Sequence, residues 1–163
     1  MIGIWNHKDS ACAKEIIKLQ RSAYGEEAAW IGRKDLPPLF ETEKDIEKSG
    51  DIHLAEMEAG ELLGMLVFAM EPQVLHMHKL MVFPCHSRKR VASHLLEFVE
   101  YTWKPEVIFV STASGNDPAI EFYRKHGFRI QNQEKKEDGF VLTHLMKRVS
   151  RGVGAENICW KEK

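Results

Sequence analysis

The sequence predicts one α/β domain built on a mostly antiparallel mixed sheet of six to seven strands, with helices on both faces. Three strand-like segments follow one another between residues 52 and 83 and are joined by short turns, which is typical of antiparallel strands. The last of them, residues 76–83, is followed by an amphipathic helix and another strand-like segment, which indicates one parallel crossover. The predicted order is two helices, three strands, a helix, a strand, a helix and two strands.

The chain is predicted to open with a short strand over residues 2–5 and to continue into a helix. Asp9 or Ser10 is a suitable N-cap, because its side-chain oxygen can accept a backbone N–H of the first turn. The helix that follows carries apolar residues at helical spacing, and we expect it to end near Gly25.

Residues 25–40 contain many apolar side chains without a regular period. Such a segment is typical either of a lid folded over a site or of a loop that covers the edge of a core. A second, short helix is predicted after it. Thr42 caps its start, Asp45 stands three residues later, and Ser49-Gly50 ends it.

Strands predicted over residues 52–57 and 62–70 form a hairpin around the turn at 58–61. The next strand, residues 76–83, ends at Pro84. In the helix after it, a broad apolar stripe recurs at helical spacing, formed by Val91, Ala92, Leu95, Leu96, Phe98, Val99 and Trp103.

The last part of the chain is predicted to contribute one strand, one helix and a closing hairpin. Residues 107–112 begin with a continuous apolar run, which is typical of a strand buried on both faces. Asn116 is predicted to cap a helix with Pro118 in its first turn, and Gly127 to end it. The two final strands are predicted over residues 128–133 and 140–146.

The composition argues against several classes of protein. The formal net charge is −1, which argues against a general nucleic-acid binder. The three cysteines, Cys12, Cys85 and Cys159, lie far apart and form no metal-ligand spacing, which predicts a reduced protein without a metal site. We find no secretory signal and no apolar run long enough to cross a membrane, so we expect a cytoplasmic protein.

A length of 163 residues is most simply one domain with its own core. Residues 1–149 contain all the predicted elements and are expected to form that domain. Residues 150–163 lack periodicity and are expected to be a C-terminal tail, which Ile158 and Trp160 would dock against the domain.

The junction between the strand at 76–83 and its helix is a candidate anion site. The first backbone N–H groups of a helix have no intrahelical partner, and the helix dipole places partial positive charge there. Arg88, Lys89 and Arg90 add full positive charges at that end, where they oppose the dipole unless an anion compensates them. We therefore predict a phosphate seat at this junction.

Two segments together resemble the GCN5-related N-acetyltransferase (GNAT) family. Residues 82–96, which read VFPCHSRKRVASHLL, resemble its acetyl-CoA-binding segment. Residues 116–128, which read NDPAIEFYRKHGF, resemble the second characteristic segment of the family closely. The resemblance implies a single N-acetyltransferase domain over residues 1–149, with acetyl-CoA as co-substrate.

One departure from the family pattern lies in the diphosphate loop. That loop usually reads Gln or Arg, two residues, Gly, any residue, and Gly or Ala. Here the first position is Ser87, the central glycine is replaced by Arg90, and the small residue Ala92 is kept. The Arg90 side chain could obstruct the diphosphate or grip it, and we favour a grip.

The resemblance implies which residues bind the cofactor. The backbone of Leu80, Met81 and Val82 would pair with the amide-rich pantetheine arm as an added strand does. Asn116 would hydrogen-bond the cofactor, or else serve only as a helix cap. The diphosphate would be held by Arg88, Lys89, Arg90, Val91, Ala92 and Ser93.

The resemblance also implies the catalytic residues. Tyr123 matches the tyrosine that protonates the departing thiolate, although a core tyrosine on an apolar helix face is the simpler alternative. The base that takes the amine proton is assigned to His76, with His78 or an ordered water as alternatives. Some relatives carry a glutamate at the position of Ser111, and a serine cannot serve as the base there.

The expected reaction is direct transfer of an acetyl group from acetyl-CoA to a primary amine in a ternary complex. The acceptor would be a small molecule or a peptide, and the resemblance leaves a homodimer open. The alternative is a coenzyme A or acyl-CoA sensor of the same fold with weak or no catalysis, which the changes at Ser87 and Arg90 favour. A phosphate-binding protein unrelated to coenzyme A is a third interpretation.

Overall fold

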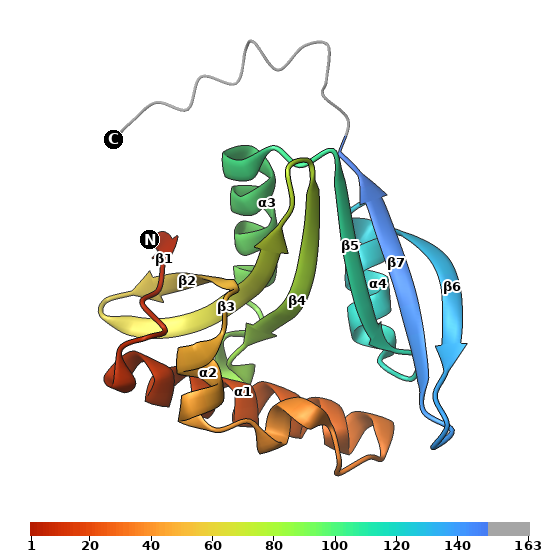
Figure 1. Ribbon diagram of the computed structural model, residues 1–163, viewed down its shortest axis with the longest axis horizontal. Coiled ribbons are helices and arrows are strands. Elements are labelled where there is room, and N and C mark those ends of the chain that lie inside the picture. Colours follow the sequence, from red (N-terminus) through yellow and green to blue (C-terminus); the bar gives the residue numbers. More distant parts are fainter. Residues whose placement is uncertain (150–163) are drawn as a thin grey trace.

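A computed structural model of the protein describes residues 1–149 (Figure 1). The predicted tail, residues 150–163 with Ile158 and Trp160, lies outside the described residues. The described elements are β1 (Ile2–Ile4), α1 (Ser10–Ile31), the 3₁₀ helix η1 (Pro37–Phe40), α2 (Glu43–Lys48), β2 (Ile52–Glu58), β3 (Glu61–Met70), β4 (Val74–Val82), the 3₁₀ helix η2 (Pro84–His86), α3 (Val91–Trp103), β5 (Val107–Ala113), α4 (Asp117–Lys125), β6 (Arg129–Lys135) and β7 (Val141–Arg148).

The strands of residues 1–149 form one seven-stranded sheet in the order β1-β2-β3-β4-β5-β7-β6. Every pair of neighbours is antiparallel except β4 and β5, which α3 connects as a parallel crossover. The predicted fold class, strand number and element order are therefore confirmed. No helix within the described part of the chain is long and apolar enough to cross a membrane.

Helices cover both faces of the sheet, as predicted, and a separate apolar core lies under each set. On one face α3 and α4 pack through residues such as Leu95 and Tyr123 against Phe68 of β3. On the other face α1 packs through Ile16 against Met65, also of β3. Because successive side chains of a strand point to opposite faces, one strand can supply both cores. Figure 1 shows α1 crossing the lower end of the sheet, well away from the upper ends of β5 and β7.

The first helix is longer than predicted. It passes through Gly25 without a break and ends at Gly32, whose left-handed backbone (φ 72°) and N–H bond to the Ala28 carbonyl oxygen cap the helix. A glycine inside a helix costs only about 1 kcal/mol relative to alanine. The good helix formers from Glu26 to Ala29 offset that cost, so the predicted end at Gly25 is wrong by about two turns. The N-cap at Asp9 is confirmed, since its side chain accepts two backbone N–H groups.

The predicted burial of β5 on both faces is wrong. Ile108 and Val110 point into the core under α3 and α4, whereas Phe109 is 39% exposed and Ser111 is exposed on the opposite face. That opposite face is uncovered because α1 packs mainly over β2 to β4. The apolar run at 107–110 therefore marks a central strand with one open face.

Strand β4 contains an irregularity that matters for the site. Val67 of β3 lies opposite Lys79, but its neighbour Phe68 lies opposite Met77, so His78 is an extra residue on β4. Such a bulge changes the phase of the alternation. Beyond it Met81 joins the core under α1, while Leu80 packs against the core under α3.

Candidate functional site

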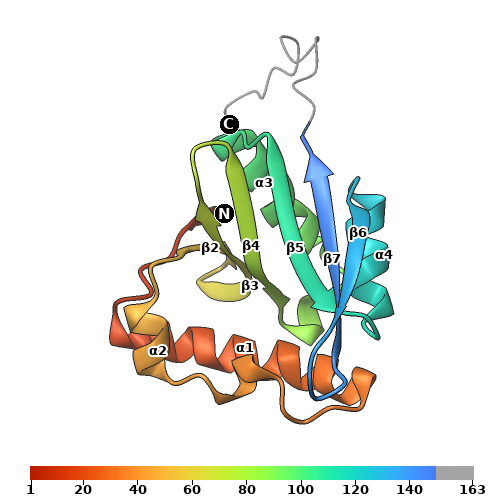
Figure 2. The ribbon, with the colours of Figure 1, turned by 45° about the vertical axis from the view of Figure 1, so that its right-hand side comes forward.

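Strands β4 and β5 form a fork. They pair over only four residues each, Val74–Met77 with Val107–Val110, although β4 continues to Val82 and β5 to Ala113. Beyond the paired residues the two strands diverge toward the end of the sheet that α1 crosses (Figure 2). The remainder of β4 therefore has a partner strand only on its β3 side.

The open edge of β4 offers backbone groups to an extended ligand. Phe83 donates its N–H to the Leu63 carbonyl oxygen across the β3 side at 3.0 Å. Because the backbone groups of successive residues point to opposite edges of a strand, those of Leu80 and Val82 point into the fork. An amide-rich chain can pair with such an edge as an added strand.

The loop that leaves β4 delivers the exposed N–H groups of α3 to the same end of the sheet. No side chain within residues 1–149 caps α3, and the first intrahelical bond of this turn runs from the His94 N–H to the Arg90 carbonyl oxygen at 3.0 Å. The N–H groups of residues 91–93 precede that bond, so they are the unpaired donors of a helix N-terminus. The cap position Arg90 adopts the left-handed conformation (φ 57°, ψ 25°), which is the conformation that glycine adopts most readily.

The three predicted cations of this loop have different surroundings. Lys89 forms an ion pair with Glu58 at 2.8 Å, and Glu58 raises the pKa of the Lys89 ammonium. The Arg90 guanidinium lies 3.7 Å from Glu97, two turns along α3, and its side chain is 70% exposed. Arg88 makes no ion pair with residues 1–149. The side chain of Arg90 thus runs along the helix and does not cover the N–H groups.

Two cavities lie along the fork and share part of their lining. One, of about 350 Å³, extends from Ser87 in the loop past Met81 to α1. The other, of about 180 Å³, lies between the diverging strands and reaches Tyr123 of α4. Tyr24, Glu27, Leu80 and Asn116 line both. The two cavities therefore form a path from the loop before α3 to the tyrosine hydroxyl.

Tyr123 is 6% exposed and packs edge to face against Phe128. Burial is the main reason that its pKa is raised, and the carboxylate of Glu27 raises it further. The phenol is therefore protonated throughout the neutral range. Tyr123 is both a core residue and a lining residue of the fork, so the two interpretations of its sequence position do not exclude each other.

Glu27 and Tyr24 line both cavities of the fork. Burial raises the pKa of the Glu27 carboxyl, and a hydrogen bond from Asn116 acts against that shift. The pKa of Tyr24 is raised by burial and then by Glu27. Both residues lie on the part of α1 near or beyond Gly25. The helical spacing of Tyr24, Glu27 and Ile31 across that glycine is the signal that the helix continues to Ile31.

Asn116 fits both of its predicted roles. Its side-chain oxygen accepts the Ala119 N–H at 3.3 Å and thereby caps α4. The same side chain lines both cavities. The predicted cap is thus confirmed, and the hydrogen bond to a cofactor stays a prediction.

The two candidate histidines lie on the uncovered face of the sheet. His76 stacks on Phe109, with 5.7 Å between the ring centroids, and lines a cavity of about 230 Å³ that does not include Tyr123. His78, the bulged residue, lines both that cavity and the one with Tyr123. Its Nδ1 lies 2.8 Å from a carboxylate oxygen of Asp51. His76 therefore lines only the cavity next to the one that Tyr123 lines, whereas His78 lines both cavities.

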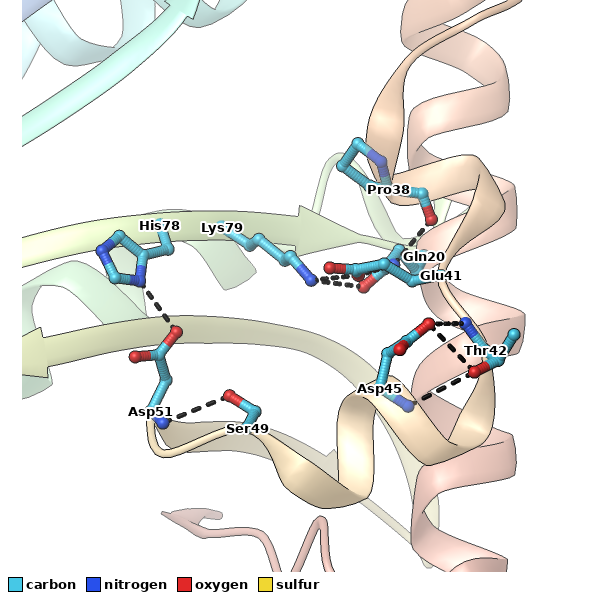
Figure 3. Close-up of polar contacts among 9 residues, drawn as sticks. All are labelled: Gln20, Pro38, Glu41, Thr42, Asp45, Ser49, Asp51, His78 and Lys79. Carbon is cyan, nitrogen blue, oxygen red and sulfur yellow. Dashed lines mark hydrogen bonds and ion pairs between the residues drawn. The ribbon is translucent and has the colours of Figure 1, made fainter.

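Partly buried polar contacts hold the segment 36–41 against α1 and β4 (Figure 3). The side-chain amide of Gln20 in α1 donates to the Pro38 carbonyl oxygen at 2.7 Å and also bonds to Glu41. The ammonium of Lys79 in β4 bonds to Glu41 at 2.5 Å and to Gln20 at 3.0 Å. Leu36, Pro37 and Pro38 of the segment line the cavity with Tyr123, and the choice between a lid and a loop over the core edge stays a prediction.

Solved structures of acetyltransferases share this fold. A PaiA N-acetyltransferase from Thermoplasma acidophilum in complex with coenzyme A superposes with a TM-score of 0.69, at 13% identity over 91% of this chain and 99% of that one. The ribosomal-protein-S18-alanine N-acetyltransferase from Escherichia coli gives 0.71, at 14% identity over 97% and 99%. An aminoglycoside 6'-N-acetyltransferase complexed with coenzyme A gives 0.69, at 14% identity over 93% and 99%.

Comparison at the level of sequence gives two further matches. UPF0157 protein YqkA from Bacillus subtilis (strain 168) is 32% identical over 165 residues, which cover 99% of this chain and 48% of that protein. The chain thus spans about half the length of this relative. The sequence model of the acetyltransferase (GNAT) family matches residues 14–128, which include the loop before α3 and the whole of α4. Because that match spans well over half of the residues of this chain, the chain belongs to the acetyltransferase (GNAT) family.

Proposed function

We propose that this protein transfers the acetyl group of acetyl-CoA directly to a primary amine. The observation that carries the proposal is the pair of adjoining cavities that extends from Ser87, in the loop before α3, along the open edge of β4 to Tyr123. The match to the acetyltransferase family and the two neighbours solved with coenzyme A support the same cofactor.

The residues along this path fit coenzyme A. The diphosphate suits the N–H groups of residues 91–93 and the nearby cation Arg88, which makes no ion pair within residues 1–149, because both carry positive charge. The pantetheine arm suits the backbone of Leu80 and Val82, since its amides can continue the sheet. Acetyl-CoA supplies the activated thioester, and the protein supplies the binding site and the groups that transfer protons.

Tyr123 is proposed to protonate the sulfur as it leaves. Its raised pKa keeps it in the donor form, and Glu27 is one of the two causes of that shift. A cationic acceptor bound beside Glu27 would offset the carboxylate charge and bring the phenol pKa closer to that of the thiol. The acceptor is proposed to approach from the side of α1, where Glu26 and Glu27 line the larger cavity. His76 and His78 stay predictions for the residue that takes the amine proton.

The proposal is tested by measuring free thiol released from acetyl-CoA in the presence of single amines. A suitable panel contains an N-terminal alanine peptide, a lysine peptide, spermidine and an aminoglycoside, with acetyl-CoA alone as the blank. We expect at least one amine to accelerate thiol release well above the blank. A melting temperature that rises with coenzyme A while no amine reacts would instead support the sensor. No response to either would overturn both functions.

Arg90 can be tested separately. Because the left-handed conformation costs an L-residue about 1 kcal/mol, Arg90→Gly should raise the melting temperature by about 2–4 °C. Arg90→Ala keeps the Cβ and should not. Both variants remove the cation, so we expect calorimetry to show coenzyme A binding weakened by about fivefold in each, the effect of about 1 kcal/mol for an exposed charge. Tighter binding by Arg90→Gly alone would show that the side chain obstructs the diphosphate.

A further inference from the structure

Three side chains on the uncovered face of the sheet form a hydrogen-bonded chain that no prediction anticipated. The Ser111 hydroxyl of β5 lies 2.6 Å from Nδ1 of His144 in β7. Nε2 of the same ring lies 2.8 Å from a carboxylate oxygen of Glu134 in β6. The register explains the alignment, because Ser111 lies directly opposite His144 and Glu134 lies diagonally from it on the next strand.

The chemistry of the partners fixes the direction of the hydrogen bonds. A carboxylate only accepts, so Nε2 carries the ring proton and donates it to Glu134. In the neutral ring Nδ1 then accepts from the Ser111 hydroxyl. Lys136 bonds to Glu134 at 2.6 Å, and together with His144 it lowers the pKa of the Glu134 carboxyl. The hydrogen-bonded series thus ends at the Glu134 carboxylate. It begins at the Ser111 hydroxyl, which is bonded to the imidazole of His144.

Ser111 stands where the fork opens. It is the first residue of β5 beyond Val110, the last residue paired with β4. It lines the cavity that contains Tyr123 and also the neighbouring cavity that contains His76. His144 is 30% exposed, so a proton that reaches its ring can pass on to solvent. Ser111 therefore lies at the cavity of the proposed reaction centre, which Tyr123 also lines, and His144 is bonded to Ser111.

We propose that Ser111, His144 and Glu134 form the relay that removes the proton from the acceptor amine. The inference rests on the proposed acetyl transfer. As the amine nitrogen bonds to the thioester carbonyl carbon, its proton passes to the Ser111 oxygen while the hydroxyl proton of Ser111 passes to Nδ1 of His144. The C–S bond breaks, and the sulfur takes a proton from Tyr123. Serine alone is no base, and His144 supplies the basic nitrogen that it lacks.

Ser111 is the catalytic residue of this relay, because it alone touches the amine. His144 accepts the proton through Ser111, and Glu134 holds the ring in the required tautomer and stabilises the imidazolium once it forms. Glu134 is the charged group that bonds to His144 within this strand pair, and Lys136 bonds to Glu134 in turn.

The test compares kcat/KM for thiol release with the best amine of the panel from pH 6 to pH 9. Ser111→Ala and His144→Ala should each lower it by about 100-fold at pH 7, within the range of general base catalysis. The loss should shrink toward pH 9 as hydroxide takes over, and added imidazole should restore part of the activity of His144→Ala. Glu134→Gln, a milder change on an exposed strand, should give a smaller loss in the same direction.

Ser114→Ala is the matched control. Ser114 also bridges the β5 and β7 region, through a 2.7 Å bond to Thr143, but it lines neither cavity of the fork. We expect it to keep the wild-type pH profile. Melting temperature and coenzyme A binding, measured for every variant, separate misfolding from a lost proton transfer.

The outcomes distinguish the relay from the function on which it rests. A wild-type protein that releases no thiol with any amine overturns the transfer and the relay together. An active wild type whose Ser111→Ala and His144→Ala variants keep full activity at pH 7 overturns the relay and leaves the transferase intact. A large loss in His76→Gln with none in His144→Ala would assign the proton to His76 instead.

Discussion

Replacing Tyr123 with phenylalanine should lower kcat by about one to three orders of magnitude, which overlaps the contribution of about 10²–10⁴-fold that general acid–base catalysis usually makes. The thiolate would then leave without its proton donor, while every other contact along the fork is kept. The ring is buried and packs against Phe128, so phenylalanine preserves the packing. Affinity for coenzyme A should change little, because the seat of the diphosphate lies at the other end of the path.

The measurement is steady-state thiol release together with calorimetric titration of coenzyme A. Tyr101→Phe is the matched control, since this tyrosine is 64% exposed on α3 and lies outside the fork. We expect Tyr101→Phe to behave as wild type in both measurements. If Tyr123→Phe retains full kcat, the phenol is only a core residue and the proton comes from elsewhere.

Gly64→Ala should destabilise the protein and weaken its hold on coenzyme A together. A Cβ at this position of β3 would lie 2.6 Å from the Met81 carbonyl oxygen and 2.8 Å from Cγ1 of Val91. Neither contact is tolerable, and one of the atoms belongs to the β4 backbone that borders the fork. Overpacking of this kind costs about 2–3 kcal/mol, which should lower the melting temperature by roughly 5–10 °C.

The effect on binding arises because Gly64 lets β4 and the start of α3 lie close together. Val91 is the first residue of α3, so an added methyl group would push the unpaired N–H groups of the helix away from β4. We expect coenzyme A affinity to fall by about tenfold, equivalent to ~1.4 kcal/mol. Gly3→Ala is the matched control, because nothing lies within 4 Å of its added Cβ. Unchanged affinity in Gly64→Ala would show that the spacing of α3 and β4 does not matter.

The order of the elements could be predicted because each has a strong local signal. The Thr42 and Asp45 capping box is present as predicted, with the Thr42 hydroxyl accepting the Asp45 N–H and the Asp45 carboxylate accepting the Thr42 N–H. Periodicity likewise located α3. The end of α1 could not be read in the same way, because a glycine at position 25 is tolerated by a helix whose neighbours are good helix formers.

The site could be predicted only where it follows one stretch of chain. Tyr123 and the loop before α3 could be proposed from the sequence because each lies in a contiguous segment with a recognisable pattern. The relay was missed because Ser111, Glu134 and His144 come from three strands, and only the register of β5, β6 and β7 brings them together. No spacing in the sequence records such an alignment. The covered or open state of the β5 faces was missed for the same reason, since it depends on where α1 lies.

The central claim is that coenzyme A lies in the fork with its sulfur beside Tyr123, and a crystal structure of the protein with coenzyme A tests it most directly. We predict that the diphosphate oxygens accept hydrogen bonds from the N–H groups of residues 91–93 and that the sulfur lies in contact with the Tyr123 hydroxyl. A coenzyme bound away from the diverging ends of β4 and β5, or a sulfur turned away from α4, would contradict the account.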